Sequence, residues 1–217
     1  MKNKSMPDNC LFRGFTEEET ESVLKCLSAV SRSYKKDEYI FRMGDTITTV
    51  GMVITGSVQV MREDYWGDRQ IIAGIGAGQI FGESYACAVG EPLMVSVMAA
   101  ENTEVMFLEV RKLLTVCSMA CQFHSRVIQN LLTVIAGRNL TLTTKIDHMS
   151  KKTIREKVLS YLSYQAEKEG KGSFDIPFNR QQLADYLAVD RSALSAELSK
   201  MQKEKIISYD KNHFVLL

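Results

Sequence analysis

One guanidinium and three hydroxyl groups recur within residues 191–199 at spacings that place them on one outward side of a helix. They belong to Arg191, Ser192, Ser195 and Ser199. An arginine can form two hydrogen bonds with the edge of a guanine, and serine hydroxyls can bond to the edges of several bases. The pattern therefore predicts a helix surface that reads base pairs in a DNA groove.

Two short helices within residues 178–201 would have to hold this surface. The spacing of their apolar residues gives each helix one buried side, with Leu183, Ala184 and Leu187 in the first and Leu194, Leu198 and Met201 in the second. Residues 188–190 form the turn, and the carboxylate of Asp190 can cap the second helix. This layout is typical of a helix-turn-helix, but an ordinary helical hairpin in a packed core has it too.

The flanking residues favour the DNA-binding interpretation. Residues 174–178 alternate as a short strand does, and residues 206–209 and 213–216 predict a β-hairpin around a turn at 210–212. Such a hairpin would be the wing of a winged helix-turn-helix. Residues 151–217 also contain 12 Lys and Arg against 9 Asp and Glu, a net charge of +3, whereas residues 1–150 sum to −2. This small basic excess is on the side that phosphate contact requires.

The earlier part of the chain has a different pattern. Residues 6–32 predict a helix, with Thr16 as its N-cap and Glu17–Glu19 in its first turn. Between residues 34 and 110, short β-rich runs alternate with glycine-containing turns. The runs are residues 39–41, 49–54, 57–61, 70–73, 95–99 and 105–110. They predict a β-sandwich, roll or jelly roll.

A long helical pattern over residues 111–149 separates the two halves. Its length exceeds what a small domain needs and suggests pairing with a second subunit, although such a helix could also simply lie across its own β-roll. We expect both, with one flank packed on the β-roll and another on a second subunit. A break at residues 148–150 precedes a helix that begins with a capping box, Thr153 to Glu156, and ends at Gly170. We therefore divide the chain into a β-roll at 1–110, a dimerisation helix at 111–149 and a DNA-binding domain at 150–217.

Several other classes of protein are not indicated. The sequence contains no apolar run near the roughly 18 residues of a membrane span, and no secretory signal follows residues 1–5, so a cytoplasmic location is expected. The five cysteines lack Cys-x-x-Cys spacing, which argues against zinc and a disulfide framework. Cys117 and Cys121 are four residues apart and could share a helix face. No catalytic set or metal-ligand cluster stands out, so an enzyme is not expected.

The order of these elements, with several short motifs, resembles the CRP/FNR family of bacterial transcription regulators. The matching segments are residues 44–45, 56–58, 78–83 and 180–187. The resemblance implies an α+β protein with an N-terminal antiparallel β-roll sensor domain, a long dimerisation helix and a C-terminal winged helix-turn-helix. It further implies a homodimer that binds double-stranded DNA, a small effector, and contact with RNA polymerase if the protein is an activator.

The resemblance also locates a possible effector site. In members that bind cyclic nucleotides, a Phe-Gly-Glu sequence opens the phosphate-binding cassette, and an Arg-Ser or Arg-Thr pair completes it after Gly-Glu-Pro. Here Leu93 and Met94 stand in place of that pair. A buried cyclic phosphate would then lack its guanidinium, so an effector other than cAMP is expected. The candidate contacts are Gly82, Glu83, Ser84, Leu93 and Met94, although Glu83 could instead hydrogen-bond the cassette turn.

The identity of the effector stays open. An apolar or aromatic ligand near Leu93 and Met94 is one possibility, and cysteine oxidation is another. A haem-based gas sensor would need an axial ligand, for which His124 is a candidate on the long helix and His148 lies at its end. Cys10 and Cys26 are too sparse for the cluster of an iron–sulfur sensor.

The DNA-reading helix departs from the family pattern. Arg191 matches a family arginine, but Ala196 occupies the place of a second one, and Ser192 replaces a residue that is commonly acidic. Base reading is therefore expected to depend mainly on Arg191. Arg180, Gln181 and Lys200 are candidates for phosphate contacts. Ala188 replaces a glycine that is common in the turn, so the turn is expected to be either slightly strained or differently built.

Overall fold

The computed structural model describes residues 9–66, 69–114 and 122–217. The chain divides into two compact units, Met1–Ala136 and Gly137–Leu217. The division falls within one long helix, α4 (Gln122–Ser150), so each unit contains part of that helix.

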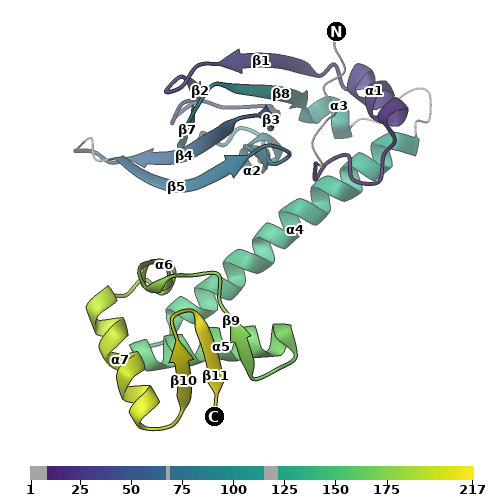
Figure 1. Cartoon of the computed structure of the whole chain (residues 1–217). Helices are drawn as coiled ribbons and strands as arrows, with labels where there is room; N and C mark the ends of the chain where they lie inside the picture. The colour runs from purple at the N-terminus through teal and green to yellow at the C-terminus, as the bar shows by residue number, and fades with distance from the viewer. Residues whose placement is uncertain (1–8, 67–68, 115–121) are drawn as a thin grey trace. The chain divides into compact units, whose positions relative to one another are not determined.

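The first unit is built, within its described residues, on two four-stranded antiparallel sheets. Their strand orders are β1-β8-β3-β6 and β2-β7-β4-β5 (Figure 1). Side chains from both sheets are buried in one apolar cluster, which confirms the predicted antiparallel β-roll. The strands are β1 (Val30–Tyr34), β2 (Tyr39–Phe41), β3 (Thr49–Thr55), β4 (Ser57–Glu63), β5 (Arg69–Gly76), β6 (Ile80–Phe81), β7 (Ser96–Ala99) and β8 (Thr103–Glu109).

The N-terminal helix is shorter than the sequence predicts. α1 (Glu17–Cys26) begins with the expected cap, in which the Thr16 hydroxyl accepts a hydrogen bond from the Glu19 N–H at 3.2 Å. The prediction of helix over residues 6–32 is wrong on both sides of α1 where the structure describes them. After α1 the chain forms strand β1, which pairs with β8. A strand held by such a distant partner leaves little trace in local periodicity.

The structure describes residues 111–114 and 122–149 of the helical pattern expected over residues 111–149, and they belong to α3 (Val110–Leu114) and α4. α3 comes directly after β8, and α4 starts at Gln122. Cys117 and Cys121, for which a shared helix face was a possibility, lie outside the described residues. Within the first unit, Val127 and Leu131 of α4 are buried in an apolar cluster with residues of the roll and of the N-terminal segment.

Polar contacts also join α4 to the N-terminal segment. The side-chain amide of Asn130 donates to the carbonyl oxygen of Leu11 at 2.8 Å. The guanidinium of Arg126 lies 4.2 Å from the centre of the Phe15 ring and pairs with Glu19 at 3.2 Å. The beginning of α4 is therefore an integral part of the first unit.

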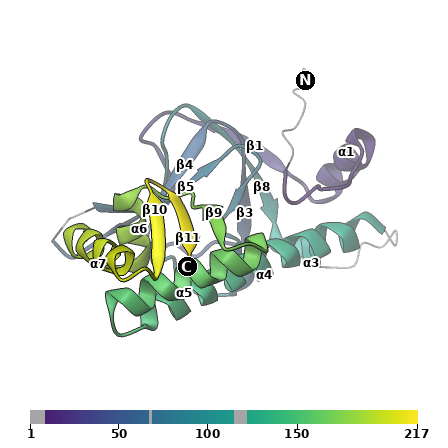
Figure 2. The same ribbon diagram turned by 60° about the horizontal axis from the view of Figure 1, so that its bottom comes forward.

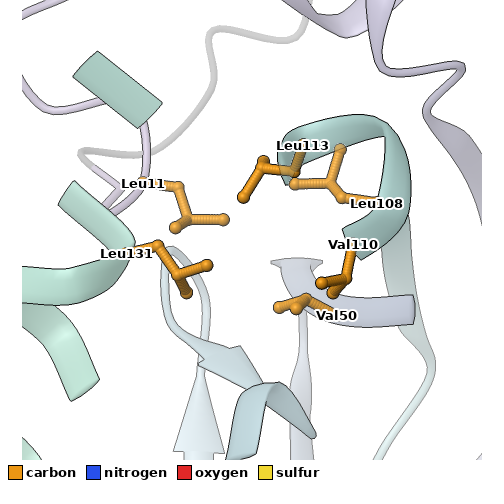
Figure 3. A pocket seen from close by; sticks show the side chains of 6 residues that line it. All are labelled: Leu11, Val50, Leu108, Val110, Leu113 and Leu131. Atoms are coloured by element: carbon orange, nitrogen blue, oxygen red, sulfur yellow. The ribbon is translucent and has the colours of Figure 1, made fainter. Parts of the chain in front are cut away.

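A small cavity lies where α4 meets the roll. Leu11 and Leu131 face the other lining residues across it (Figure 3). Its volume is about 10 Å³, roughly the space of one water molecule. Because the lining is entirely apolar, a water would find no hydrogen-bond partner there, and the cavity serves packing rather than ligand binding. The lining residues are Leu11, Val50, Leu108, Val110, Leu113 and Leu131.

The second unit contains the predicted winged helix-turn-helix. In its sheet, β11 lies between β10 and β9 (Figure 2). The expected capping box of Thr153 and Glu156 and the left-handed C-cap at Gly170 are both confirmed for α5. After the end of α4 at Ser150, the elements are α5 (Ile154–Glu169), β9 (Ser173–Asp175), α6 (Arg180–Leu187), α7 (Arg191–Lys203), β10 (Ile207–Asp210) and β11 (His213–Leu216).

A buried histidine joins the end of α4 to α5 and α6 in this unit. His148 is 2% exposed, and its Nδ1 lies 2.8 Å from the hydroxyl of Ser160. Its Nε2 has no hydrogen-bond partner among the described residues. The rings of Tyr161, Tyr164 and Tyr186 are centred 5.8, 5.6 and 6.2 Å from the imidazole. Burial lowers the pKa of His148, because this site disfavours the charged form.

We expect the stability of this unit to fall as the pH drops below about 6.5, the pKa of an unfolded histidine. The unfolded chain then takes up a proton that His148 in the folded protein resists, so the loss grows until the pH reaches the lower folded pKa. Calorimetric unfolding of wild type and His148→Gln at pH 7.5 and 5.5 measures this effect. Wild type should lose more stability than the variant, and parallel losses would contradict the assignment.

Candidate nucleic-acid interface and effector site

Both helices of the helix-turn-helix begin at a residue whose side chain caps them. Asp190 is the N-cap of α7, and its carboxylate accepts a hydrogen bond from the Ala193 N–H at 2.8 Å, as the sequence predicts. At the start of α6, the Asn179 side chain accepts a hydrogen bond from the Gln182 N–H at 2.9 Å. In return, the Gln182 side-chain oxygen accepts one from the Asn179 N–H. The sequence analysis missed this second capping box, although its spacing of three residues is a recognisable signal.

Ala188, which stands in place of a glycine common in the turn, has a left-handed backbone conformation. Its φ and ψ are 50° and 59°, and it serves as the C-cap of α6. A Cβ in this conformation lies too close to the neighbouring backbone. The turn between the two helices is therefore strained at one residue.

α7 is divided cleanly into a buried side and an exposed side. Leu194, Leu198 and Met201 each have an exposed fraction of 0%. The residues expected to face DNA are all accessible: Arg191, Ser192, Ser199 and Lys200 are exposed, and Ser195 is half-buried. The predicted reading surface thus faces solvent in the second unit.

The serine hydroxyls on this surface already have partners within the helix. Ser195 donates to the carbonyl oxygen of Arg191 at 3.0 Å, and Ser199 donates to that of Ser195 at 2.9 Å. Ser192 donates to the carboxylate of Asp190, and this hydrogen bond is the main reason that the pKa of Asp190 is lowered. To bind a base edge, each serine must rotate away from such a bond. The guanidinium of Arg191 has no such competing bond in the part of the chain that the structure describes.

One arginine of α5, whose role was not predicted from the sequence, helps to fix the orientation of α7. Arg155 of α5 bonds to Glu197 at 2.6 Å and to Glu204 at 2.7 Å, at the middle and the C-cap of α7. The hydrogen bond to Glu204, followed by that to Glu197, raises the pKa of Arg155. The bond from Arg155 in turn lowers the pKa of Glu204. These residues are far apart in sequence, so no local spacing indicates the network.

The three expected phosphate-contact residues differ in their surroundings. Gln181 is exposed and donates to Asp185 at 2.8 Å, and Lys200 is exposed on α7. Arg180 is half-buried, with its guanidinium over the rings of Tyr209 and Phe214 in the wing. Burial lowers the pKa of Arg180.

The structure brings the candidate effector residues together at one end of the roll. Gly82 has φ of 76° and caps the short helix α2 (Glu83–Cys87). Its conformation needs glycine, and a Cβ there would also lie 3.0 Å from Ile47. The N–H of Met94 donates to the Tyr85 hydroxyl at 3.3 Å, which ties the segment at 93–94 to α2.

The candidate residues differ strongly in burial. Glu83 is 4% exposed and Leu93 is 1% exposed, whereas Met94 is 57% exposed, and Ser84 is exposed. Leu93 belongs to the apolar cluster between the sheets. Both of its backbone polar groups are hydrogen-bonded. The Gly44 N–H donates to its carbonyl oxygen at 2.8 Å, and its own N–H donates to the backbone carbonyl oxygen of Asp45 at 2.9 Å. Leu93 therefore forms part of the core of the roll.

The described cysteines and histidines give no sign of a preformed redox or metal site. Among the described residues, Cys10, Cys26 and Cys87 are not joined in disulfide bonds. Burial, and to a lesser degree the charge of Glu83, raises the pKa of Cys87, which disfavours the reactive thiolate. His124 is 6% exposed. Within residues 9–66, 69–114 and 122–217 there is no cluster of three potential metal ligands, and no helix is long and apolar enough to cross a membrane.

Taken together, the β-roll, the long helix and the winged helix-turn-helix are the architecture of a DNA-binding regulator. Residues 31–119 match the family model of the cyclic nucleotide-binding domain, and residues 156–217 match that of the Crp-like helix-turn-helix domain. The chain is 25% identical over 202 residues to the Cyclic AMP receptor protein of Thermus thermophilus, covering 93% of this chain and 89% of that protein. The chain belongs to the CRP/FNR family of bacterial transcription regulators.

Two further comparisons agree with this assignment. The Transcriptional activator protein FnrL of Cereibacter sphaeroides is 23% identical over 195 residues, which cover 86% of this chain and 75% of that protein. The structure of the Catabolite Activator Protein of Thermus thermophilus has a TM-score of 0.52 at 22% identity, covering 96% of this chain and 94% of the other. At this identity the structural likeness supports the fold.

Replacing Ala188 with glycine should stabilise the second unit by roughly 0.5–1 kcal/mol. Relief of the left-handed strain exceeds the entropy that glycine adds to the unfolded chain. Chemical denaturation of the full chain measures the change. Ala196→Gly is the matched control, because Ala196 is exposed within α7 and glycine there should destabilise by about 1 kcal/mol. Equal destabilisation by both variants would contradict the strain.

Proposed function

We propose that this protein is a homodimeric, effector-responsive transcription regulator of the bacterial cytoplasm that binds double-stranded DNA through α7. It carries out no catalysis of its own, and it contacts RNA polymerase if it acts as an activator. The observation that carries the proposal is the accessible reading surface at the start of α7, where the guanidinium of Arg191 is exposed beside Ser192. An arginine in this position can take a guanine as its bidentate partner.

Dimer formation is proposed through residues 111–149. α4 leaves large apolar side chains more than half exposed, and such side chains favour burial against a partner. Leu142 and Ile146, one helical turn apart, have exposed fractions of 60% and 65%. A parallel pair of such helices would present two winged domains to half-sites one DNA turn, about 34 Å, apart. The exposed residues are Leu132, Leu140, Leu142 and Ile146.

The proposed effector is a small molecule that is not a cyclic nucleotide. Where nucleotide-binding members of the family have an arginine for the phosphate, the side chain of Leu93 is buried in the core of the roll. An anionic phosphate placed there would lose its hydration without gaining a cation. Gly82, Glu83, Ser84, Leu93 and Met94 are the proposed surroundings of the effector, and its binding would shift the population of DNA-competent conformations.

Replacing Arg191 with alanine should weaken specific DNA binding by roughly 1–3 kcal/mol and relax specificity at one base pair in each half-site. A duplex is first selected from random sequence by the wild-type protein, and affinities are then measured by mobility shift. Lys168→Ala is the control, because it removes an exposed charge of α5 outside the reading surface and should leave base preference unchanged. Unaltered base preference in Arg191→Ala would contradict the assigned register.

Titration calorimetry with cAMP and with cGMP should detect no binding at concentrations up to about 1 mM. Micromolar binding of either nucleotide would contradict the proposed effector class. Native mass spectrometry of protein purified from its own cells then identifies the resident ligand by mass. A haem would be visible in the absorption spectrum, and a mixed or intramolecular disulfide after peroxide treatment would favour the redox alternative.

A further inference from the structure

One guanidinium connects the start of α6 to the wing. The Cζ atom of Arg180 lies 4.9 Å from the ring centre of Tyr209 on β10 and 5.7 Å from that of Phe214 on β11. One of its terminal nitrogens donates to the carbonyl oxygen of Lys211 in the turn between these strands, at 3.3 Å. A planar guanidinium suits both contacts, because it can stack on a ring while an edge nitrogen donates a hydrogen bond.

Tyr209 also lies next to the recognition helix. Its ring stacks on Phe214 with centres 5.6 Å apart and planes 25° apart. Its hydroxyl lies 3.4 Å from that of Ser199 on α7. Arg180, Tyr209 and Phe214 therefore form a small stack where α6, α7 and the wing meet, which we call the wing stack.

Two residues next to Lys211 at the tip of the wing, Asn212 in the turn and His213 at the start of β11, have separate attachments to β9 and to Ile176 after it. His213 contacts Asp175 at 3.0 Å and Ser173 at 3.1 Å, and the Asn212 side chain donates to Ile176 at 3.2 Å. These contacts hold β11 in its sheet. At the turn itself, Lys211 has a left-handed φ of 52°, and Arg180 bonds to its carbonyl. Loss of the Arg180 side chain should therefore release Lys211 in the turn, while Asn212 and the sheet keep their own hydrogen bonds.

Arg180 and Lys211 differ in exposure, which indicates different roles for the two cations. The guanidinium of Arg180 is half-buried against aromatic rings and already bonded to the backbone. The side chain of Lys211 is exposed at the tip of the wing. A phosphate contact requires an exposed cation that is free to approach the DNA backbone. Lys211 meets this requirement better than Arg180 does.

We propose that Arg180 is a positioning residue, which holds the wing turn so that Lys211 contacts a DNA phosphate beside the reading surface of α7. The inference rests on the proposed DNA-binding function. It reassigns Arg180, which the sequence analysis treated as a phosphate contact, and it adds Lys211 to the interface. DNA affinity then depends on Arg180 through the wing and not through its own charge.

The salt dependence of affinity for the selected duplex tests this division. Each phosphate contact that is lost lowers the slope of log affinity against log salt by about 0.9. Lys211→Gln should therefore weaken binding and lower the slope by this amount. Arg180→Lys keeps the charge but removes the planar stack, and it should reproduce both effects. In the Arg180→Lys background, Lys211→Gln should have little further effect on the slope.

Two variants of Tyr209 provide a matched pair. Tyr209→Leu removes the aromatic face while both basic residues remain, and it should reproduce the loss seen with Arg180→Lys. Tyr209→Phe keeps the stack and should bind DNA as wild type does. Unfolding midpoints of all variants separate loss of folding from loss of wing position, and Tyr209→Leu still tests the inference if Arg180→Lys fails to fold.

A direct phosphate contact by Arg180 would give different results with the same variants. If Arg180 itself contacts a phosphate, Arg180→Lys keeps most of the affinity and the slope, and its effect adds to that of Lys211→Gln. That result would overturn the inference while leaving DNA binding intact. Failure of the wild-type protein to select or retard any duplex would instead overturn the proposed function.

Discussion

Burial of one side of α7 is the interaction on which the DNA-binding surface depends. Leu194, Leu198 and Met201 are fully enclosed in the core of the second unit, and each contributes roughly 1.5–3 kcal/mol relative to an exposed position. Because these residues lie on one side of the helix, their burial requires the opposite side to face solvent. Arg155 then limits rotation of the helix by bonding to Glu197 and Glu204. The position of Arg191 is therefore a consequence of packing beneath it.

The β-roll also depends on an interior that is filled with apolar side chains. In the roll, Leu93 continues the apolar cluster formed with Phe81 and the strands of both sheets. An arginine in its place would need an anion as partner, whereas leucine stabilises the roll with no ligand bound. The turn at Gly82 has a left-handed backbone at the start of α2. This chain thus combines a β-roll with a buried leucine at position 93, where the resemblance led us to look for an arginine.

Helix α4 contains residues of both units and has two kinds of apolar side chain. Val127 and Leu131 are buried within the first unit, and Asn130 is hydrogen-bonded to the N-terminal segment there. Leu142 and Ile146 are exposed farther along. At its end, His148 is enclosed by tyrosine rings of α5 and α6. One helix thereby connects the packing of the roll, an apolar surface suited to a second subunit and the core beneath the helix-turn-helix.

The sequence by itself determined the features that depend on near neighbours. The apolar spacing of α6 and α7, the cap at Asp190 and the β-rich runs between glycine-containing turns are local, so they could be read from residue order. The exchange of the family arginine for Leu93 was also visible. Strand β1 was not, because an edge strand forms only when a distant strand offers its backbone groups.

Tertiary structure alone decided the surroundings of the charged groups. Arg155, the wing stack and His148 depend on side chains that meet from separate elements, and no local spacing indicates such contacts. The two interpretations of Arg180, free cation or stacked side chain, are equally compatible with its place at the first position of α6. Which of them holds depends on whether an aromatic surface lies close to Arg180, and the folding of the wing brings Tyr209 and Phe214 there. Sequence therefore determined which helix carries the proposed reading surface, and packing decided which of the nearby cations are enclosed by other side chains.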